Sequence, residues 1–311
     1  MHLRSLLGAT LALGLASVSA SGQVEPSWKL KEGDQFFLQT NNQLRQTTKI
    51  SQETVISEDT LTVERFKVLK KDANRLVFEK TILARKVKSG VKGPAAGSAT
   101  EKSLDEKHAE ISKKIEGSAC TITMDANLGK VIDVQGVDEF VARTFGDKPA
   151  LEKTLAASLG ARTVKEEVES VFCAFLPGVP VKPGDTWKRK TVISFGAMGE
   201  FAADGRYTYR GDDILDGQSL NRIDVKWALN YVPPGKNSGL PYTIKSADLK
   251  TEKAEGAYLF DATTGRLVQF QRNVRVKGTI EVSLGGDDAE MNIESQLTTT
   301  YRLLGKNPER K

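Results

Sequence analysis

The chain carries the same turn signature twice, and this repetition strongly limits the folds it can adopt. Residues 182–187 (Lys-Pro-Gly-Asp-Thr-Trp) and residues 31–36 (Lys-Glu-Gly-Asp-Gln-Phe) both read lysine, any residue, Gly-Asp, any residue, aromatic. A second pair of signatures follows in the same order, because residues 124–131 and 260–267 share Asp-x-x-x-Gly followed by a basic residue. Two ordered matches predict a duplicated module with a bridge between its copies.

Alternation of apolar and polar residues predicts that strands dominate both copies. The clearest run has Val268, Phe270, Val274, Val276, Ile280, Val282 and Leu284 at even positions. This pattern is typical of one long strand, or of two strands joined by a kink at Gly278, with one buried face. Residues 285–288 (Gly-Gly-Asp-Asp) predict a hairpin turn, after which residues 291–303 return along the same face. We expect a mainly antiparallel β fold with a helical segment: two duplicated curved sheets or half-barrels, or one continuous sheet, packed against helices.

Helical spacing occurs in two places. Leu104, His108, Ile111 and Ile115 predict a short amphipathic helix over residues 103–115, after a loop at 88–99. Residues 138–175 carry helix formers, with an apolar stripe that starts at Val164 and ends before Pro177 and Gly178. The expected organisation is a signal peptide at 1–20, a β-rich repeat at 21–137, a helical bridge at 138–176, a second β-rich repeat at 177–304 and a tail at 305–311.

The first twenty residues have the form of an export signal. A short basic start is followed by an apolar run from Leu6 to Val18, and residues 18–20 (Val-Ser-Ala) have the small-x-small form of a cleavage site. The apolar run is too short to span a membrane. We therefore expect cleavage near Ala20, a periplasmic or extracellular protein, and no transmembrane segment in the mature chain.

Composition argues against several classes of partner. The formal net charge is only +5 and the charges are evenly mixed, which does not suit a nucleic-acid surface. Aromatic residues make up 7% of the chain, which argues against a cleft lined with stacking rings. His108 is the one histidine left after cleavage, and the chain has no phosphate-binding glycine loop and no nucleophile elbow. We expect no cofactor, no metal site and no catalytic residue.

The two cysteines leave two interpretations open. Export would permit a disulfide between Cys120 and Cys173. Their apolar neighbourhoods, one in a predicted strand and one in a predicted helix, equally suit two buried free thiols.

Acidic residues at predicted turns favour structure over chemistry. Asp212-Asp213 and Asp287-Asp288 could bind calcium, but both pairs lie close to glycine in predicted turns. Asp34 and Asp185 belong to the repeated Gly-Asp turns, where an aspartate accepts backbone N–H bonds. Their occurrence in both copies favours the same structural role.

The ordered signatures resemble a known family. Residues 31–36, 129–136 (Gly-Lys-Val-x-x-Val-x-Gly), 176–187 and 260–266 are similar to a family of exported bacterial proteins of the planctomycete type, catalogued only as a domain of unknown function. That resemblance implies no activity. The expected architecture also looks like the half-barrels of periplasmic lipoprotein carriers, which hold acyl chains between a curved sheet and helices.

The leading hypothesis is an exported, non-enzymatic binding or cell-envelope-associated protein. It would hold an apolar small molecule between the concave sheet faces and the bridge, or bind an envelope protein. The candidate cavity residues are Trp187, Trp227, Phe260, Phe270 and Phe172, although aromatic residues on buried strand faces are also typical of plain core. One alternative is a structural module that binds protein through a sheet edge or face. The second alternative is a carboxylate-dependent hydrolase, which requires two carboxylates within roughly 5–10 Å in an open cleft.

Overall fold

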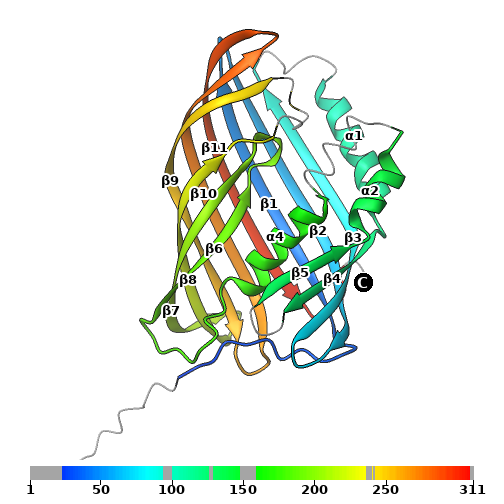
Figure 1. The fold of residues 1–311 in the computed structure, drawn as a ribbon, viewed down its shortest axis with the longest axis vertical. Helices are drawn as coiled ribbons and strands as arrows, with labels where there is room; N and C mark the ends of the chain where they lie inside the picture. Colours follow the sequence, from blue (N-terminus) through cyan, green and yellow to red (C-terminus); the bar gives the residue numbers. More distant parts are fainter. Residues whose placement is uncertain are drawn as a thin grey trace, which may run out of the picture.

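One curved sheet makes up most of the molecule. A computed structural model describes residues 23–93, 100–125, 129–147, 159–235, 240 and 242–308. Within these residues eleven antiparallel strands form a single sheet in the order β5-β4-β3-β2-β1-β11-β10-β9-β8-β7-β6 (Figure 1). The predicted mainly antiparallel β fold with helices is confirmed, as one continuous sheet and not as two separate half-barrels. The expected signal peptide, and most of the helix expected before Leu159, lie outside the described residues.

Most of the strands are much longer than an average β-strand. Their bounds are β1 Gln35–Lys49, β2 Glu53–Lys71, β3 Arg75–Lys92, β4 Ala119–Asp125, β5 Lys130–Gln135, β6 Thr186–Ser194, β7 Glu200–Leu215, β8 Gln218–Val232, β9 Thr243–Asp261, β10 Arg266–Leu284 and β11 Asp287–Leu304. The longest of them have 19 residues, well beyond the ~5–6 of an average strand. An open sheet of eleven strands is large enough to curl.

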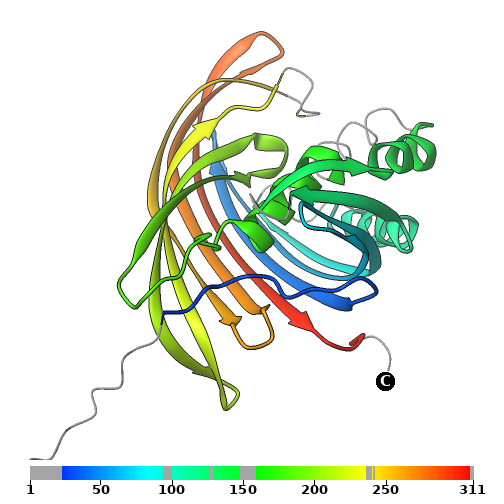
Figure 2. The ribbon, with the colours of Figure 1, turned by 60° about the horizontal axis from the view of Figure 1, so that its bottom comes forward.

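Helices lie on one side and inside the curve of this sheet. They are α1 Thr100–Ile115, α2 Val137–Phe145 and α4 Ala161–Val168, which continues directly into a π-helical turn at Glu169–Cys173. Figure 2 shows α4 within the concave side, whereas α1 lies next to β3. Both α4 and the π-helical turn contact β5 and β6, which are the two edge strands of the sheet. The bridge therefore spans from one edge of the curve to the other.

The repeated Gly-Asp turns have the same hydrogen bonds in both copies. Asp34 Oδ2 accepts a bond from the N–H of Lys31 at 3.0 Å, and Asp185 Oδ2 accepts one from the N–H of Lys182 at 2.9 Å. Gly33 and Gly184 both have positive φ, +84° and +96°, and each N–H donates to the neighbouring strand, β2 or β7. The side chains of these aspartates accept hydrogen bonds from backbone N–H groups of their own turns, as the sequence predicts.

The second signature pair also closes equivalent hairpins. Residues 125–130 join β4 to β5 and residues 261–266 join β9 to β10, with Gly129 at φ +58° and Gly265 at φ +64°. Each signature thus falls at the same step of a five-strand meander, β1 to β5 and β6 to β10, with β11 between β1 and β10. This placement agrees with a duplicated module; the domain boundaries themselves remain a prediction.

An aromatic core fills one end of the concave face. Phe172, in the π-helical turn, packs on Phe66 of β2 at 5.2 Å between ring centroids. Phe175 follows it and packs on Tyr258 of β9 at 4.9 Å. Trp28 covers this end and donates from Nε1 to the carbonyl of Phe172 at 2.6 Å. One short segment of the bridge therefore packs against strands of both copies.

Two local expectations were wrong, and one strand was not predicted. The unpredicted strand is β9, because its first two-thirds, residues 243–255, are largely polar and lack a clear apolar alternation. Residues 88–92 were expected in a loop but continue β3, paired with β2. Asp212 and Asp213 were expected in a turn but lie in β7, because the turn comes later, at Asp216 and Gly217.

We predict that Gly278 cannot be replaced without loss of stability. Its φ is +158°, and a Cβ added there would lie 1.9 Å from the carbonyl oxygen of Asp248 on β9. Gly278→Ala should lower the free energy of unfolding by about 1–3 kcal/mol, as overpacking does elsewhere. The measurement is urea denaturation followed by circular dichroism. Gly305→Ala is the matched control, because an added Cβ meets nothing within 4 Å there. Equal stability of the two variants would contradict this close approach of β9 and β10.

Candidate functional site

A cavity lies between the concave face and the helices. Its volume is about 400 Å³, within the ~300–1,000 Å³ of small-molecule sites. Residues of β1, β2, β3, β4, β6, β10 and β11 line it from the sheet, and α1, α2, α4 and the π-helical turn line it from the other side. Protein interiors are close-packed, so a space of this size is a feature that needs an explanation.

The lining is amphipathic. One group of its apolar side chains comes from the helical side and the adjoining end of β3, and includes Ile82, Ile115, Phe140, Val141, Leu159 and Val164. The sheet contributes a floor that is rich in threonine, including Thr40, Thr60 and Thr62. The expected location, between the concave sheet and the bridge, thus contains a cavity, but its walls are not wholly apolar.

The five aromatic candidates do not line this cavity. Phe260, Phe270 and Phe172 are at most 4% exposed and belong to the packed aromatic core, together with Trp227. Trp187 is half-buried and stacks on Tyr207 at 5.9 Å. The prediction that these residues form the cavity walls was wrong. The reason is that α4 and the π-helical turn fill the end of the concave face where the aromatic residues lie. These aromatic residues fit the alternative interpretation, in which they are plain core.

Of the other single residues singled out in the sequence, Cys120 lines the cavity, whereas Cys173 and His108 do not. Cys120 and Cys173 are free and buried, and burial raises the pKa of the Cys120 thiol to about 11. His108 on α1 lies with Nδ1 3.0 Å from the hydroxyl of Ser89, away from the cavity lining.

Three charged side chains meet in the cavity wall. The ammonium of Lys80 on β3 lies 2.8 Å from Glu64 Oε1 on β2 and 3.3 Å from Glu167 Oε2 on α4. The side chains of Lys80 and Glu64 are 7% and 6% exposed, so water screens this contact weakly. The cluster also ties the bridge to the first-copy strands.

One ammonium cannot neutralise two carboxylates. Burial, reinforced by the nearby charge of Glu167, outweighs the attraction of Lys80 and raises the pKa of Glu64 from 4.5 to about 7. Burial also opposes the charge on Lys80, but Glu64 and Glu167 outweigh it and raise the pKa of Lys80 above its ordinary range. Lys80 is therefore cationic at neutral pH, whereas Glu64 changes its charge there.

Arg272 is the cavity residue that the sequence analysis missed. It is 9% exposed and lies on β10 between Phe270 and Val274, on the buried face of the strand with the clearest alternation. The signal was present in the sequence, since Arg272 occupies an even position within an otherwise apolar stripe. Three buried polar atoms of lining residues have no hydrogen-bond partner among the described residues: Thr40 Oγ1, Glu64 Oε2 and Arg272 Nε.

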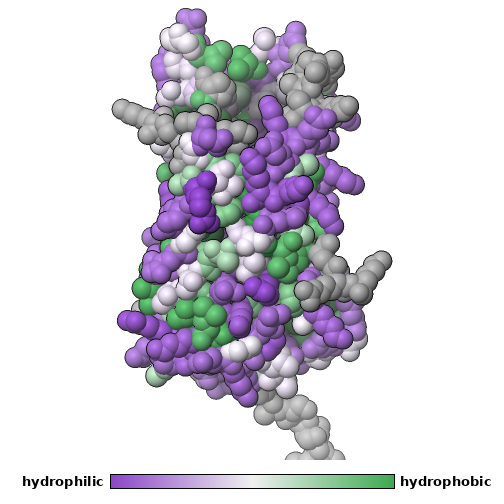
Figure 3. Space-filling view, turned by 90° about the vertical axis from the view of Figure 1, so that its right-hand side faces the viewer, coloured by the Kyte–Doolittle hydropathy of each residue, from purple (hydrophilic) through white to green (hydrophobic). Residues whose placement is uncertain are grey.

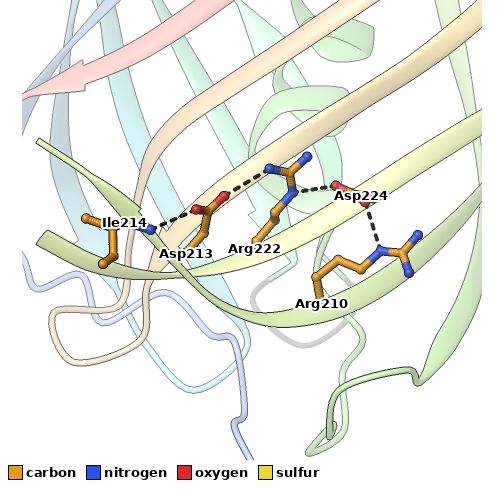
Figure 4. A network of polar contacts seen from close by, with 5 residues as sticks. All are labelled: Arg210, Asp213, Ile214, Arg222 and Asp224. Atoms are coloured by element: carbon orange, nitrogen blue, oxygen red, sulfur yellow. Dashed lines mark hydrogen bonds and ion pairs between the residues drawn. The ribbon is translucent and has the colours of Figure 1, made fainter.

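One aspartate of each acidic pair forms an ion pair. Asp213 Oδ2 accepts a bond from Arg222 at 2.9 Å, and Asp224 accepts from both Arg222 and Arg210 (Figure 4). Asp288 pairs with Lys245 across β11 and β9. Within the described part of the chain, no group of three histidine, cysteine or acidic side chains is arranged to hold a metal ion.

The outer surface on the side of α1 and α2 offers no single large apolar area. Figure 3 shows polar side chains interleaved with small hydrophobic groups on this face. The described helices are all too short or too polar to cross a membrane.

Comparison with known proteins finds a family model that is similar to part of the chain. Residues 79–213 match the family described as "Family of unknown function (DUF6263)". This match confirms the expected resemblance to a family without an assigned activity, while the bacterial lineage stays a prediction. No curated protein matches the chain.

Solved structures give only distant likenesses. One is lipovitellin, in a structure described by its lipid–protein interactions, with a TM-score of 0.41, 9% identity and coverage of 91% of this chain. The chain spans 26% of the length of that lipovitellin chain. The outer membrane protein OprG from Pseudomonas aeruginosa has a TM-score of 0.20 and 7% identity, with coverage of 90% of this chain and 99% of OprG. An outer membrane channel from Pseudomonas putida F1 has a TM-score of 0.21 and 8% identity, with coverage of 89% of this chain and 97% of the channel. TM-scores this low do not establish a shared fold.

We predict that Glu64 makes the protein less stable as the pH rises. Its pKa is raised in the folded state, so its stabilising contribution is fully present below pH 4.5 and is lost as the pH rises through about 7. The loss over this window should reach at most about 3 kcal/mol, at 1.36 kcal/mol per pKa unit. Glu64→Gln should remove this slope, measured as the free energy of urea unfolding at a series of pH values.

Glu255→Gln is the matched control, because Glu255 lies on β9 in an exposed pair with Lys253. It should keep the slope of the wild-type protein. A Glu64→Gln variant with an unchanged slope would show that Glu64 does not titrate in this window.

Proposed function

We propose that the protein is a non-enzymatic binding protein that holds a small molecule with an apolar part in the cavity between the sheet and the bridge. The observation that carries this proposal is the cavity itself, about 400 Å³ in a molecule whose remaining concave face is tightly packed. The apolar side chains on its helical side supply the driving force, at ~25 cal/mol for each Å² of apolar surface removed from water. Export after cleavage near Ala20, to the periplasm or the exterior, is part of the same proposal and rests on residues 1–20.

The lining supports binding more than turnover. It combines apolar side chains from the helices with threonine side chains that are held in place by the paired strands β1 and β2. Such a site holds a ligand with one apolar and one polar side in a defined orientation. A partner in the cell envelope that delivers or receives the ligand would fit this role.

We predict that a bulky side chain in the cavity blocks binding. Ile82 lines the cavity from β3, and Ile82→Trp should weaken the binding of the neutral fluorescent probe N-phenyl-1-naphthylamine by about tenfold or more, because the indole takes up part of the ligand volume. The measurement is a fluorescence titration of delipidated protein. Ile132→Trp is the matched control, since Ile132 is 54% exposed on β5.

Two results would contradict this proposal. The first is wild-type protein that does not bind the probe. The second is Ile82→Trp protein that is folded by circular dichroism and binds as tightly as Ile132→Trp. Native mass spectrometry of protein purified gently from its own host adds an independent check, with adducts of lipid mass as the expected result.

A carboxylate-dependent hydrolase is the second candidate, because Glu64 and Glu167 meet on one ammonium in the wall of the cavity. Two neighbouring carboxylates are the feature that favours this candidate. Against it, Lys80 occupies the space between the two carboxylates, where a hydrolase needs its substrate.

The two candidates give opposite results in one assay. A binding protein should hydrolyse nitrophenyl esters and nitrophenyl glycosides no faster than its Glu64→Gln/Glu167→Gln variant. A hydrolase should lose a measurable rate by about a hundredfold or more in Glu167→Gln, with probe binding retained. The latter result would replace the binding proposal by the hydrolase.

A further inference from the structure

Arg272 occupies an unusual position for an arginine. Its side chain lies in the cavity lining, 9% exposed, and its cross-strand neighbour on β9 is Gly256, which has no side chain to cover it. On the other side its neighbour on β11 is Thr299. A buried guanidinium is costly unless a partner neutralises it and takes up its hydrogen bonds.

The described residues provide Arg272 with very little. Its Nη2 donates a long bond of 3.5 Å to the hydroxyl of Thr299, and its Nε has no partner. No carboxylate among the described residues lies within ion-pair distance of it. By contrast Arg275, three residues along the same strand on the outer face, pairs with Glu252 at 2.9 Å and with Glu294 at 2.6 Å.

The ionisable groups around Arg272 do not serve as its counter-ion. Tyr207, Tyr258 and Tyr301 lie within electrostatic range of it. Burial raises the pKa of Tyr207 and of Tyr301 to about 12, and raises that of Tyr258 well above its usual value, so all three phenols are neutral. Glu64 and Glu167 lie within ion-pair distance of Lys80 and not of Arg272.

Arg272 and the apolar lining residue Ile82 lie at well-separated points of the cavity lining. Arg272 is on β10 and Ile82 is on β3, four strand steps away across β11, β1 and β2. At ~4.8 Å per step these two strands are about 19 Å apart along the curved sheet. The apolar groups of α2 and α4 lie over this part of the sheet, and threonine side chains form the floor of the cavity.

We propose that Arg272 binds the carboxylate head of an amphiphile whose single unbranched alkyl chain runs along the cavity toward Ile82 and α2. The planar fork of a guanidinium matches a carboxylate, and the free Nε–H and the weakly bonded Nη2–H form one edge of that fork. This assignment rests on the binding function proposed above and adds the chemical class of the ligand. Arg272 is thus a binding residue whose partner is the ligand.

The test compares two probes that differ only in the head group. Dodecanoate carries the carboxylate, and dodecan-1-ol carries the same chain without charge. Each is titrated by isothermal calorimetry into the delipidated full chain, as wild type, Arg272→Gln and Arg275→Gln. Arg275→Gln is the matched control, because it removes an equal charge from the outer face of the same strand.

We expect Arg272→Gln to weaken dodecanoate binding by about tenfold or more and to leave dodecanol binding within about twofold of wild type. Arg275→Gln should bind both probes as wild type does. Thermal unfolding without ligand gives a second expected result: Arg272→Gln unfolds at the same or a higher temperature than wild type, because an unpaired buried charge has been removed.

The outcomes separate the two proposals. If wild type and Arg272→Gln bind dodecanoate equally, the role of Arg272 is overturned and the binding function stands. The same conclusion follows if wild-type protein binds dodecanol but not dodecanoate. Wild-type protein that binds neither probe overturns the ligand class, and if it also fails to bind N-phenyl-1-naphthylamine the binding function falls with it. A large drop in the unfolding temperature of Arg272→Gln would show that Arg272 has a partner within the protein and would also overturn the assignment.

Discussion

The rest of the structure depends on how the chain passes from its fifth strand to its sixth. β5 and β6 are consecutive strands in sequence, yet they form the two opposite edges of the sheet. Their connection must therefore cross the open side of the curve. A segment in that position has an apolar concave face beneath it and solvent above it, and an amphipathic helix meets both demands with its backbone bonds satisfied internally. The π-helical turn at Glu169–Cys173 places Phe172 and Phe175 on strands of different copies.

The same crossing leaves part of the concave face unfilled. The aromatic residues of the bridge pack one end of the trough, and the helices then lie above the middle of the sheet without reaching its threonine-rich floor. The boundary between the packed end and the cavity contains Glu64, Lys80, Tyr301 and Arg272. A core that served stability alone would hold apolar side chains here, because buried ion pairs are seldom better than well-packed hydrophobic residues.

The charges at this boundary are consistent with an anionic ligand. With Glu64 protonated, Lys80 and Glu167 balance each other, and the charge of Arg272 is left over. A carboxylate beside Arg272 would neutralise it. Because Glu64 changes its charge near pH 7, the electrostatic environment of the cavity changes in the same range. The cluster that ties the bridge to the first copy thus also sets the charge that a ligand meets.

The sequence by itself determined the fold class, the strands with clear alternation and the two pairs of turns. Those features depend on local rules: the two-residue period of a strand, and the need for glycine where φ is positive, as at Gly33 and Gly184. It did not determine β9, whose polar residues gain their place by pairing with β10. It also could not separate cavity from core. Phe172 and Phe270 are residue types that suit either a ligand pocket or a core. The path of the bridge decided that both belong to the packed core, whereas Arg272, Lys80 and Glu64 line the cavity. Burial of that kind depends on residues far apart in the chain, so tertiary structure alone could decide it.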